Sequence, residues 1–252
     1  MADNISVTIL TNNSGAYLFE CLSALEAFSE VVIVDNGSTD DTITIASGFT
    51  NVTLHEHPFI GFGPMKNIAV DNASNDWILS VDSDEIVTPE LAREILNLKL
   101  DCNTVYMIDR DNYYHRRLIR GCGWDNDRVE RLFNRKSTRY DDKLVHEGLI
   151  MNGNLKTELL SGRLNHYPYD NASQLLHKMQ HYSTLWAEEY HGRKTASPLK
   201  AMLYGMLTFL KSYLLKNGWR YGYEGLLISA SNANGVFYKY IKLYEADREH
   251  RL

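Results

Sequence analysis

Two aspartates one residue apart stand directly after an apolar run in this chain of 252 residues. The run is "WILSV" (77–81), and Asp82, Ser83, Asp84 and Glu85 follow it. Acidic oxygens on a tight turn can hold Mg²⁺ or Mn²⁺ and leave coordination positions open for phosphate oxygens and water. We therefore expect a buried strand that presents a metal and diphosphate site at its end.

Two further polar segments follow apolar runs. Thr11, Asn12 and Asn13 come after the run 5–10, and "DNGS" (35–38) closes the run 31–35. In parallel sheets, ligands bind beyond the carboxyl ends of the strands, so these segments and the Asp82 turn are expected to converge on one edge. Asn, Asp, Gly and Ser are also ordinary loop formers, which explains any one segment but explains all three together less well.

The elements that would position these loops alternate between strand and helix. Four short apolar runs, three of them rich in β-branched residues, predict strands at 5–10, 31–35, 77–82 and 104–109. Helical spacing of apolar residues predicts a helix between the first two strands, at Leu18, Cys21, Leu22, Leu25 and Phe28. Further helices are expected after Asp40, after Pro64 and from Thr88-Pro89 onward, the last with Leu91, Ile95 and Leu98 facing inward. This order predicts an α/β fold with a mostly parallel sheet and covering helices.

Composition narrows the function classes. Hydrophobic residues make up 44% and charged residues 23%, as in an ordinary globular protein. A net charge of −6 gives no basic footprint for nucleic acid. The start "MADNISVTIL" has neither the basic nor the apolar region of a signal peptide. The three cysteines do not have the spacing of a metal site, and we expect them to be reduced thiols. We therefore expect a cytoplasmic protein that does not bind nucleic acid.

The chain from Ser197 onward differs in character from the rest. It is rich in aromatic and aliphatic residues, with Lys200, Lys211, Lys216 and Arg220 interspersed. The apolar run 201–210 is too short to span a bilayer. Two interpretations stay open, namely an interfacial helix at the inner face of the cytoplasmic membrane and a helical cap that packs on the sheet or on a second subunit of a homo-oligomer. We expect a catalytic domain at 1–165 and a helical region at 166–252.

Several motifs together resemble a known family. The segments "TILTNN", "VVIVDNGSTDDT", "GFGPMKNIAVDNASNDWILSVDSDE", "RLFNR" and "VHE" occur here in the order found in family 2 glycosyltransferases of the Rossmann-like GT-A fold. Among these the chain is most similar to small bacterial enzymes resembling lipopolysaccharide-core β-1,4-glucosyltransferases. The resemblance implies inverting sugar transfer from a nucleotide diphosphate donor, with UDP-glucose favoured, to a saccharide acceptor such as lipopolysaccharide core or another cell-surface glycan or glycolipid.

The resemblance also assigns roles to residues. Thr11 and Asn13 would line the nucleotide pocket, Asp35 would hydrogen-bond the base, and Asp84 would ligate the cation. The full nucleotide-sugar set that it implies is Thr11, Asn13, Asp35, Gly37, Lys66, Asp82, Ser83 and Arg131. One departure is visible, because the family commonly has Asn-Glu where this chain has Asn13-Ser14.

Inverting transfer needs a general base that takes the proton of the acceptor hydroxyl. The carboxylates available for this role are Glu147, Glu85, Asp109, Asp127 and Glu130. We favour Glu147, with the adjacent His146 as a metal ligand or diphosphate contact. Arg131 and Arg135 are expected either to pair with the diphosphate or to remain solvated.

Two other function classes stay open. A sugar nucleotidyltransferase shares the sheet and the metal-binding carboxylates, but it usually opens with a glycine-rich basic loop, which "TILTNNSGAYL" lacks. A non-catalytic module that binds nucleotide sugars would need the pocket without a general base.

Overall fold

The computed structural model describes residues 5–143 and 147–249. They form two compact units. The first unit holds residues 5–111 and 126–166, and the second holds residues 112–125 together with the chain from 167 onward. Each unit is described by itself below.

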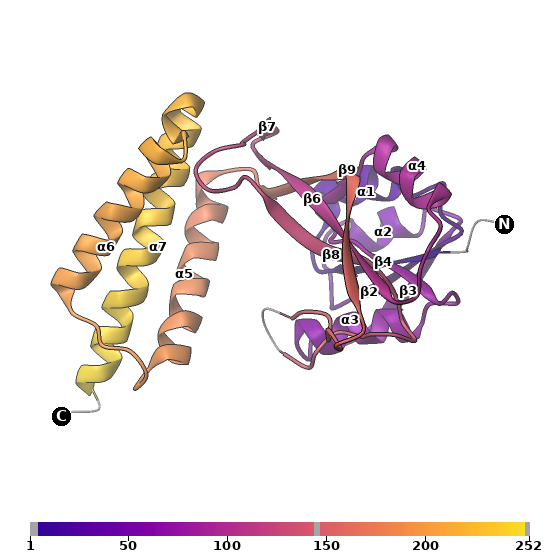
Figure 1. The fold of residues 1–252 in the computed structure, drawn as a ribbon, viewed down its shortest axis with the longest axis horizontal. Helices are drawn as coiled ribbons and strands as arrows, with labels where there is room; N and C mark the ends of the chain where they lie inside the picture. Colours follow the sequence, from indigo (N-terminus) through magenta and orange to yellow (C-terminus); the bar gives the residue numbers. More distant parts are fainter. Residues whose placement is uncertain (1–4, 144–146, 250–252) are drawn as a thin grey trace. The chain divides into compact units, whose positions relative to one another are not determined.

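Half of the sheet in the first unit is parallel. Its strands are β1 (Ile5–Thr11), β2 (Glu30–Asp35), β3 (Val52–Glu56) and β4 (Trp77–Ser80), in the order β3-β2-β1-β4. Three of them, β2, β3 and β4, are labelled in Figure 1. Thr11 lies opposite Asp35 in the register of β1 and β2. The β-branched side chains of β1 and β2 are buried on both faces, which is typical of a parallel sheet covered by helices.

The other half of the sheet is antiparallel and continues beyond β4. Its strands, in the order β8-β6-β9-β5, are β8 (Asp127–Asn134), β6 (Thr104–Tyr114), β9 (Lys156–Tyr169) and β5 (Glu85–Val87). The pairs β4–β8, β6–β8 and β5–β9 run antiparallel. β6 and β9 continue into the second unit, where the short β7 (Arg117–Leu118) pairs with β6. The predicted α/β class is confirmed, and the sheet is mixed.

Four helices belong to the first unit: α1 (Gly15–Ser23), α2 (Thr42–Ala46), α3 (Phe62–Asp71) and α4 (Pro89–Asn97). The predicted stripe of α1 is buried, although α1 ends before Leu25 and Phe28, which fill the core from the following turns. The predicted start of α4 is confirmed, because the Thr88 hydroxyl accepts a hydrogen bond from the Leu91 amide. α3 begins at Phe62, two residues before the proline expected to start it.

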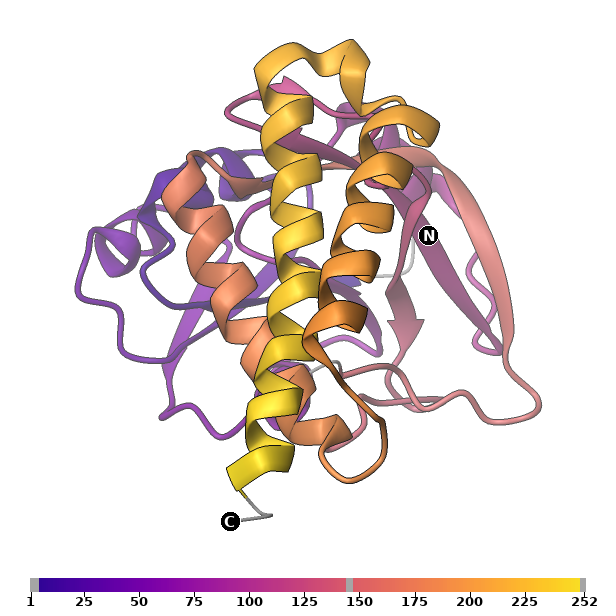
Figure 2. The same cartoon turned by 90° about the vertical axis from the view of Figure 1, so that its left-hand side faces the viewer.

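The second unit is helical. It contains α5 (Ala172–Tyr190), α6 (Pro198–Leu210), a π-helical turn (Lys211–Leu215), a 3₁₀ turn (Gly218–Tyr221) and α7 (Gly222–Glu249). α7 packs against both α5 and α6, and Figure 2 shows the three side by side. Asn171 caps α5, and Ser197 followed by a proline starts α6. Among the described residues, no helix combines the length and apolarity needed to cross a bilayer.

Candidate active site

The three polar loops meet at one edge of the sheet. The Thr11 hydroxyl after β1 donates to Asp35 Oδ1 at the end of β2, at 2.7 Å. The hydroxyl oxygens of Ser14 and Ser83 lie 2.8 Å apart, which joins the loop after β1 to the turn after β4. Asn13 accepts a hydrogen bond of 2.8 Å from the Thr39 amide. The convergence expected from parallel strand ends is therefore present.

Asp35 organises the loop that follows β2. Its buried carboxylate accepts from the amides of Gly37 (2.9 Å) and Ser38 (2.8 Å), in addition to Thr11. Burial alone would raise the pKa of Asp35, but the hydrogen bonds from Ser38, Thr11 and Gly37 lower it below its usual value. Gly37 has a φ of +93°, a conformation that glycine adopts easily. The contact of Asp35 with a nucleotide base stays a prediction.

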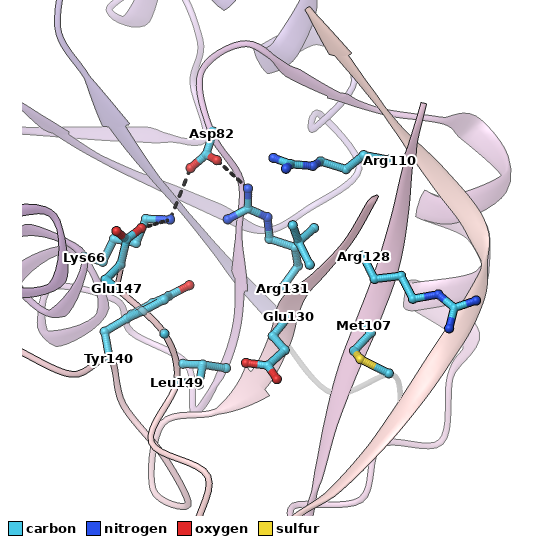
Figure 3. Close-up of a pocket in the computed structure, with 12 residues that line it drawn as sticks. Lys66, Asp82, Met107, Arg110, Arg128, Glu130, Arg131, Tyr140, Glu147 and Leu149 are labelled. Carbon is cyan, nitrogen blue, oxygen red and sulfur yellow. Dashed lines mark hydrogen bonds and ion pairs between the residues drawn. The ribbon is translucent and has the colours of Figure 1, made fainter. Parts of the chain in front are cut away.

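A network of charges surrounds Asp82. Lys66 Nζ lies 3.2 Å from Asp82 Oδ1 and 3.1 Å from Glu147 Oε1, and Arg131 Nη2 contacts Asp82 Oδ2 (Figure 3). Burial alone would raise the pKa of Asp82, but Arg131 and Lys66 hold it well below its usual range. For Lys66, burial opposes the charged form, yet the Asp82 carboxylate raises its pKa above the ordinary value. Both groups are therefore charged at neutral pH.

Glu85 anchors the turn that carries the two aspartates. Its side chain is completely buried, and Oε1 lies 2.5 Å from Arg131 Nη2 and 3.1 Å from Arg110 Nη1. Oε2 accepts from the Asp82 amide at 3.0 Å, and the Glu85 amide donates to the Asp82 carbonyl at 2.9 Å. Two guanidinium groups thus neutralise this buried carboxylate and fix the conformation of the turn.

Asp84 lies beside a residue that the sequence did not indicate as a partner. Its Oδ2 lies 3.6 Å from Nε2 of His166 on β9. His166 lies opposite Glu85 in the register of β5 and β9, which brings it to Asp84 from far along the chain. No spacing in the sequence could have linked the two residues. His146, predicted as a metal ligand, lies outside the described residues.

The donor set suits a hard cation only in part. Within residues 5–143 and 147–249, no cluster of three or more His, Cys, Asp or Glu side chains could hold a metal by itself. Asp84 and His166 provide one carboxylate oxygen and one imidazole nitrogen. Mg²⁺ is usually bound by one or two carboxylates together with phosphate oxygens and waters, so the predicted role of Asp84 as a cation ligand would need a bound diphosphate and stays a prediction.

A pocket of about 370 Å³ lies beside this network (Figure 3). Its polar lining includes Lys66, Asp82, Arg131, Tyr140, Glu130 and Glu147. Tyr140 Oη and Arg131 Nε are buried and have no hydrogen-bond partner among the described residues. Buried polar groups are normally paired, so these two atoms are exceptions among the buried polar groups of the site.

Glu130 differs from the other carboxylates proposed as general base. It makes no ion pair with a described residue, and burial raises its pKa above the ordinary value. Glu147 is paired with Lys66, Glu85 with two arginines, and Asp127 with Arg110 at 2.8 Å. Asp109 is paired with Arg128 and Arg163. Glu130 and Glu147 are the two that line the pocket.

Of the two arginines expected near a diphosphate, the structure brings one to the site. Arg131 lies in the charge network and lines the pocket. Arg135 instead donates to the carbonyls of Val70 and Ala73 and lies 3.6 Å from Asp76. It therefore anchors the end of α3.

Comparison with known proteins gives consistent matches. The profile of the family "Glycosyl transferase family 2" matches residues 6–149, more than half of the chain. The lipopolysaccharide core biosynthesis glycosyltransferase LpsC of Rhizobium meliloti is 29% identical over 252 residues, which covers 96% of this chain and 92% of LpsC. A glycosyltransferase of Rickettsia prowazekii, RP128, is 27% identical over 95% of this chain and 86% of its own length.

A solved structure has the same fold. The crystal structure of residues 1–349 of TarS from S. aureus in complex with UDP-GlcNAc superposes with a TM-score of 0.51. The match covers 98% of this chain and 91% of that chain at 16% identity.

Proposed function

The chain belongs to glycosyltransferase family 2, and we propose that it transfers a hexose from a UDP-sugar to a saccharide acceptor with inversion at the anomeric carbon. We propose UDP-glucose as the donor and a glycan such as lipopolysaccharide core, or a related glycolipid, as the acceptor. The similarity to LpsC along nearly the whole of both chains supports this acceptor class.

One observation carries the proposal. The Asp82–Glu85 turn, the loops after β1 and β2 and the pocket lined by Asp82, Glu130 and Glu147 lie together in one unit. The loops after β1 and β2 are preorganised by Thr11, Asn13, Asp35 and Gly37 to receive a nucleotide. The pocket beside Asp82 has room for a sugar, and Lys66, Glu130 and Glu147 are among the polar residues that line it. The UDP-GlcNAc complex of TarS supports a UDP-sugar as the donor class.

A divalent cation, Mg²⁺ or Mn²⁺, would be held by Asp84 and His166, and it would neutralise charge on the diphosphate that leaves. Lys66 and Arg131 both contact Asp82 in the same turn and contribute positive charge there. Arg131 is committed to Asp82 and Glu85, so we assign it to positioning the turn. Lys66 can exchange its contact with Glu147 for a phosphate oxygen without leaving Asp82.

We propose Glu147 as the general base that takes the acceptor proton. In the structure its carboxylate lies 3.1 Å from Lys66 Nζ, so this ion pair must open before the carboxylate can receive the acceptor hydroxyl. Movement of Lys66 to the diphosphate would release Glu147 only after the donor has bound. Glu130 is the alternative, because it lines the same pocket without an ion pair to a described residue, and burial raises its pKa, which strengthens the carboxylate as a base.

The proposal is tested by measuring UDP release from UDP-glucose, UDP-galactose and UDP-GlcNAc, with Mn²⁺ or Mg²⁺ and with EDTA. Slow metal-dependent hydrolysis of one donor, accelerated by a core oligosaccharide, is the expected result. Pyrophosphate-dependent exchange would instead identify a nucleotidyltransferase. Donor binding without turnover, with every acceptor tried, would identify a binding module.

A further inference from the structure

Helix α6 exposes its large apolar side chains and buries small residues, which is the opposite of the usual pattern in a helix on a water-exposed surface. Two small residues lie on its buried side: Ala201 is completely buried, and a Cβ on Gly205 would lie 3.3 Å from the carbonyl oxygen of Ala233 on α7. Its large apolar side chains are exposed instead, and Leu207, for example, is 60% exposed. Large aliphatic side chains normally drive folding by being buried.

The exposed apolar side chains form one continuous stripe. They recur at three- and four-residue intervals along α6 and the π-helical turn, which places them on one helical face. The stripe consists of Leu199, Met202, Leu203, Met206, Leu207, Leu210, Leu214 and Leu215. Trp219 and Tyr223 follow it and are also exposed. Apolar patches of this size mark interaction sites rather than ordinary surface.

Charge is segregated around this stripe. The segment 192–223 contains six basic residues and no acidic residue, although the whole chain has 26 basic and 32 acidic residues. Lys211, Lys216 and Arg220 make no ion pair with any residue that the structure describes. Lys200 is less available, because its Nζ donates to the Thr195 carbonyl at 2.8 Å. A positive, apolar surface therefore extends along α6 and the two turns that follow it.

We propose that this surface, the exposed face of residues 199–223, docks on an anionic lipid bilayer. The leucine and methionine stripe would enter the acyl boundary, and Lys211, Lys216 and Arg220 would contact the headgroups. Trp219 and Tyr223 are the aromatic types that settle at such an interface. Packing of α6 on α7 through small residues also resembles helix packing in lipid, where large side chains face outward.

A second copy of the chain fits this surface less well. A twofold dimer brings the same patch of both copies together. The three basic side chains without an ion pair would then approach their own counterparts, and the segment 192–223 offers no carboxylate to neutralise them. A bilayer with anionic lipids satisfies both the apolar and the charged parts of the surface.

The test is co-sedimentation of the full chain with phosphatidylcholine vesicles, with and without phosphatidylglycerol, at low and high salt. The expected result is binding to the anionic vesicles at low salt, weakened as salt rises. Replacing Lys211, Lys216 and Arg220 together with Gln should weaken binding roughly 100-fold. The matched control replaces Lys136, Arg139 and Lys156, which are exposed on the first unit, and should bind as wild type.

A second pair of variants tests the contribution of the apolar stripe to vesicle binding. Leu207→Gln should weaken binding roughly tenfold, whereas Leu176→Gln, equally exposed at 60% but on α5, should not. All the substituted side chains are exposed or half-buried, and urea unfolding of each variant verifies the fold. Wild-type protein that stays in the supernatant at every salt concentration would overturn the proposal. So would a dimer in sedimentation velocity that Leu207→Gln dissociates while vesicle binding is absent.

Discussion

Removing the guanidinium of Arg131 should destabilise the protein far more than removing a comparable one from the same strand. Arg131 on β8 is 5% exposed and is bonded to the completely buried Glu85 and to Asp82. Arg131→Met keeps much of the apolar volume but leaves Glu85 with Arg110 alone. Breaking a buried pair by removing one partner costs about 3–5 kcal/mol. For a chain of this length, the midpoint of thermal unfolding should fall by roughly 6–20 °C.

The control is Arg128→Met on the same strand. The Arg128 side chain is 51% exposed, and its ion pair with Asp109 lies near the surface. Exposed pairs of this kind contribute about 0–1 kcal/mol, so the control should unfold within a few degrees of wild type. Urea unfolding of wild type and both variants gives the free energies directly. Equal losses for the two variants would refute the reasoning that burial of the Glu85–Arg131 pair sets the cost.

The pH dependence gives a second readout of the same contact. Arg131 and Lys66 outweigh burial and hold the pKa of Asp82 well below its usual range in the folded protein. A lowered pKa contributes stability that is fully present above the unfolded value, about 3.9, and is lost as the pH falls through the folded value. Arg131→Met lowers the free energy of unfolding, and part of this loss comes from the contact with Asp82. That part should be constant above about pH 5 and should shrink below about pH 4.

Three further predictions concern the site and the fold. Glu147→Gln should lower turnover by about 10²-fold or more with little change in donor affinity. If Glu147→Gln instead has near-normal turnover and Glu130→Gln shows this loss, Glu130 is the general base. Asp84→Asn and His166→Gln should each weaken Mn²⁺-dependent UDP binding in isothermal titration, while the exposed control Asp71→Asn binds as wild type. Unchanged affinity in both site variants would contradict the assignment of Asp84 and His166 as cation ligands. Gly162→Ala should cost about 1–3 kcal/mol, because its Cβ would lie 2.5 Å from Leu91 Cα, whereas Gly153→Ala meets no atom within 4 Å and should be tolerated in urea unfolding.

Three of the four strands in the parallel half could be predicted from the sequence; β3 (Val52–Glu56) was not, because its run "VTLHE" holds only two apolar residues. The runs that became β1, β2 and β4 are mostly apolar because both faces of the sheet are covered there, and α4 carries its cap and proline in the sequence. In the antiparallel half, β6 was predicted as a strand at 104–109, whereas β8, β9 and β5 escaped prediction. β8 reads "DRVERLFN", and its charged residues suggest a surface loop. They are tolerated in a strand because Arg131 is neutralised by Glu85, 46 positions earlier in the chain.

The candidate site likewise has a part that the sequence could predict and a part that it could not. Loop residues at the ends of parallel strands could be located because strand direction alone brings Thr11, Asp35 and Asp82 to one edge. The pairing of Asp84 with His166 could not, since it depends on the register of β5 with β9. The distinction between Glu130 and the paired carboxylates likewise depends on which side chains lie nearby, which spacing along the chain does not reveal.

The same ion pairs explain why an apolar strand runs directly into a group of carboxylates. Three negative groups at the end of β4 would repel one another and resist burial. Glu85 turns inward to Arg131 and Arg110, and Asp82 turns to Lys66 and Arg131, so two of the three charges are neutralised within the protein. Asp84 makes no ion pair with a described lysine or arginine, and its side chain is 36% exposed beside His166. The ion pairs of Asp82 and Glu85 thus hold the turn and leave Asp84, the carboxylate that we propose as the cation ligand, without a described lysine or arginine partner.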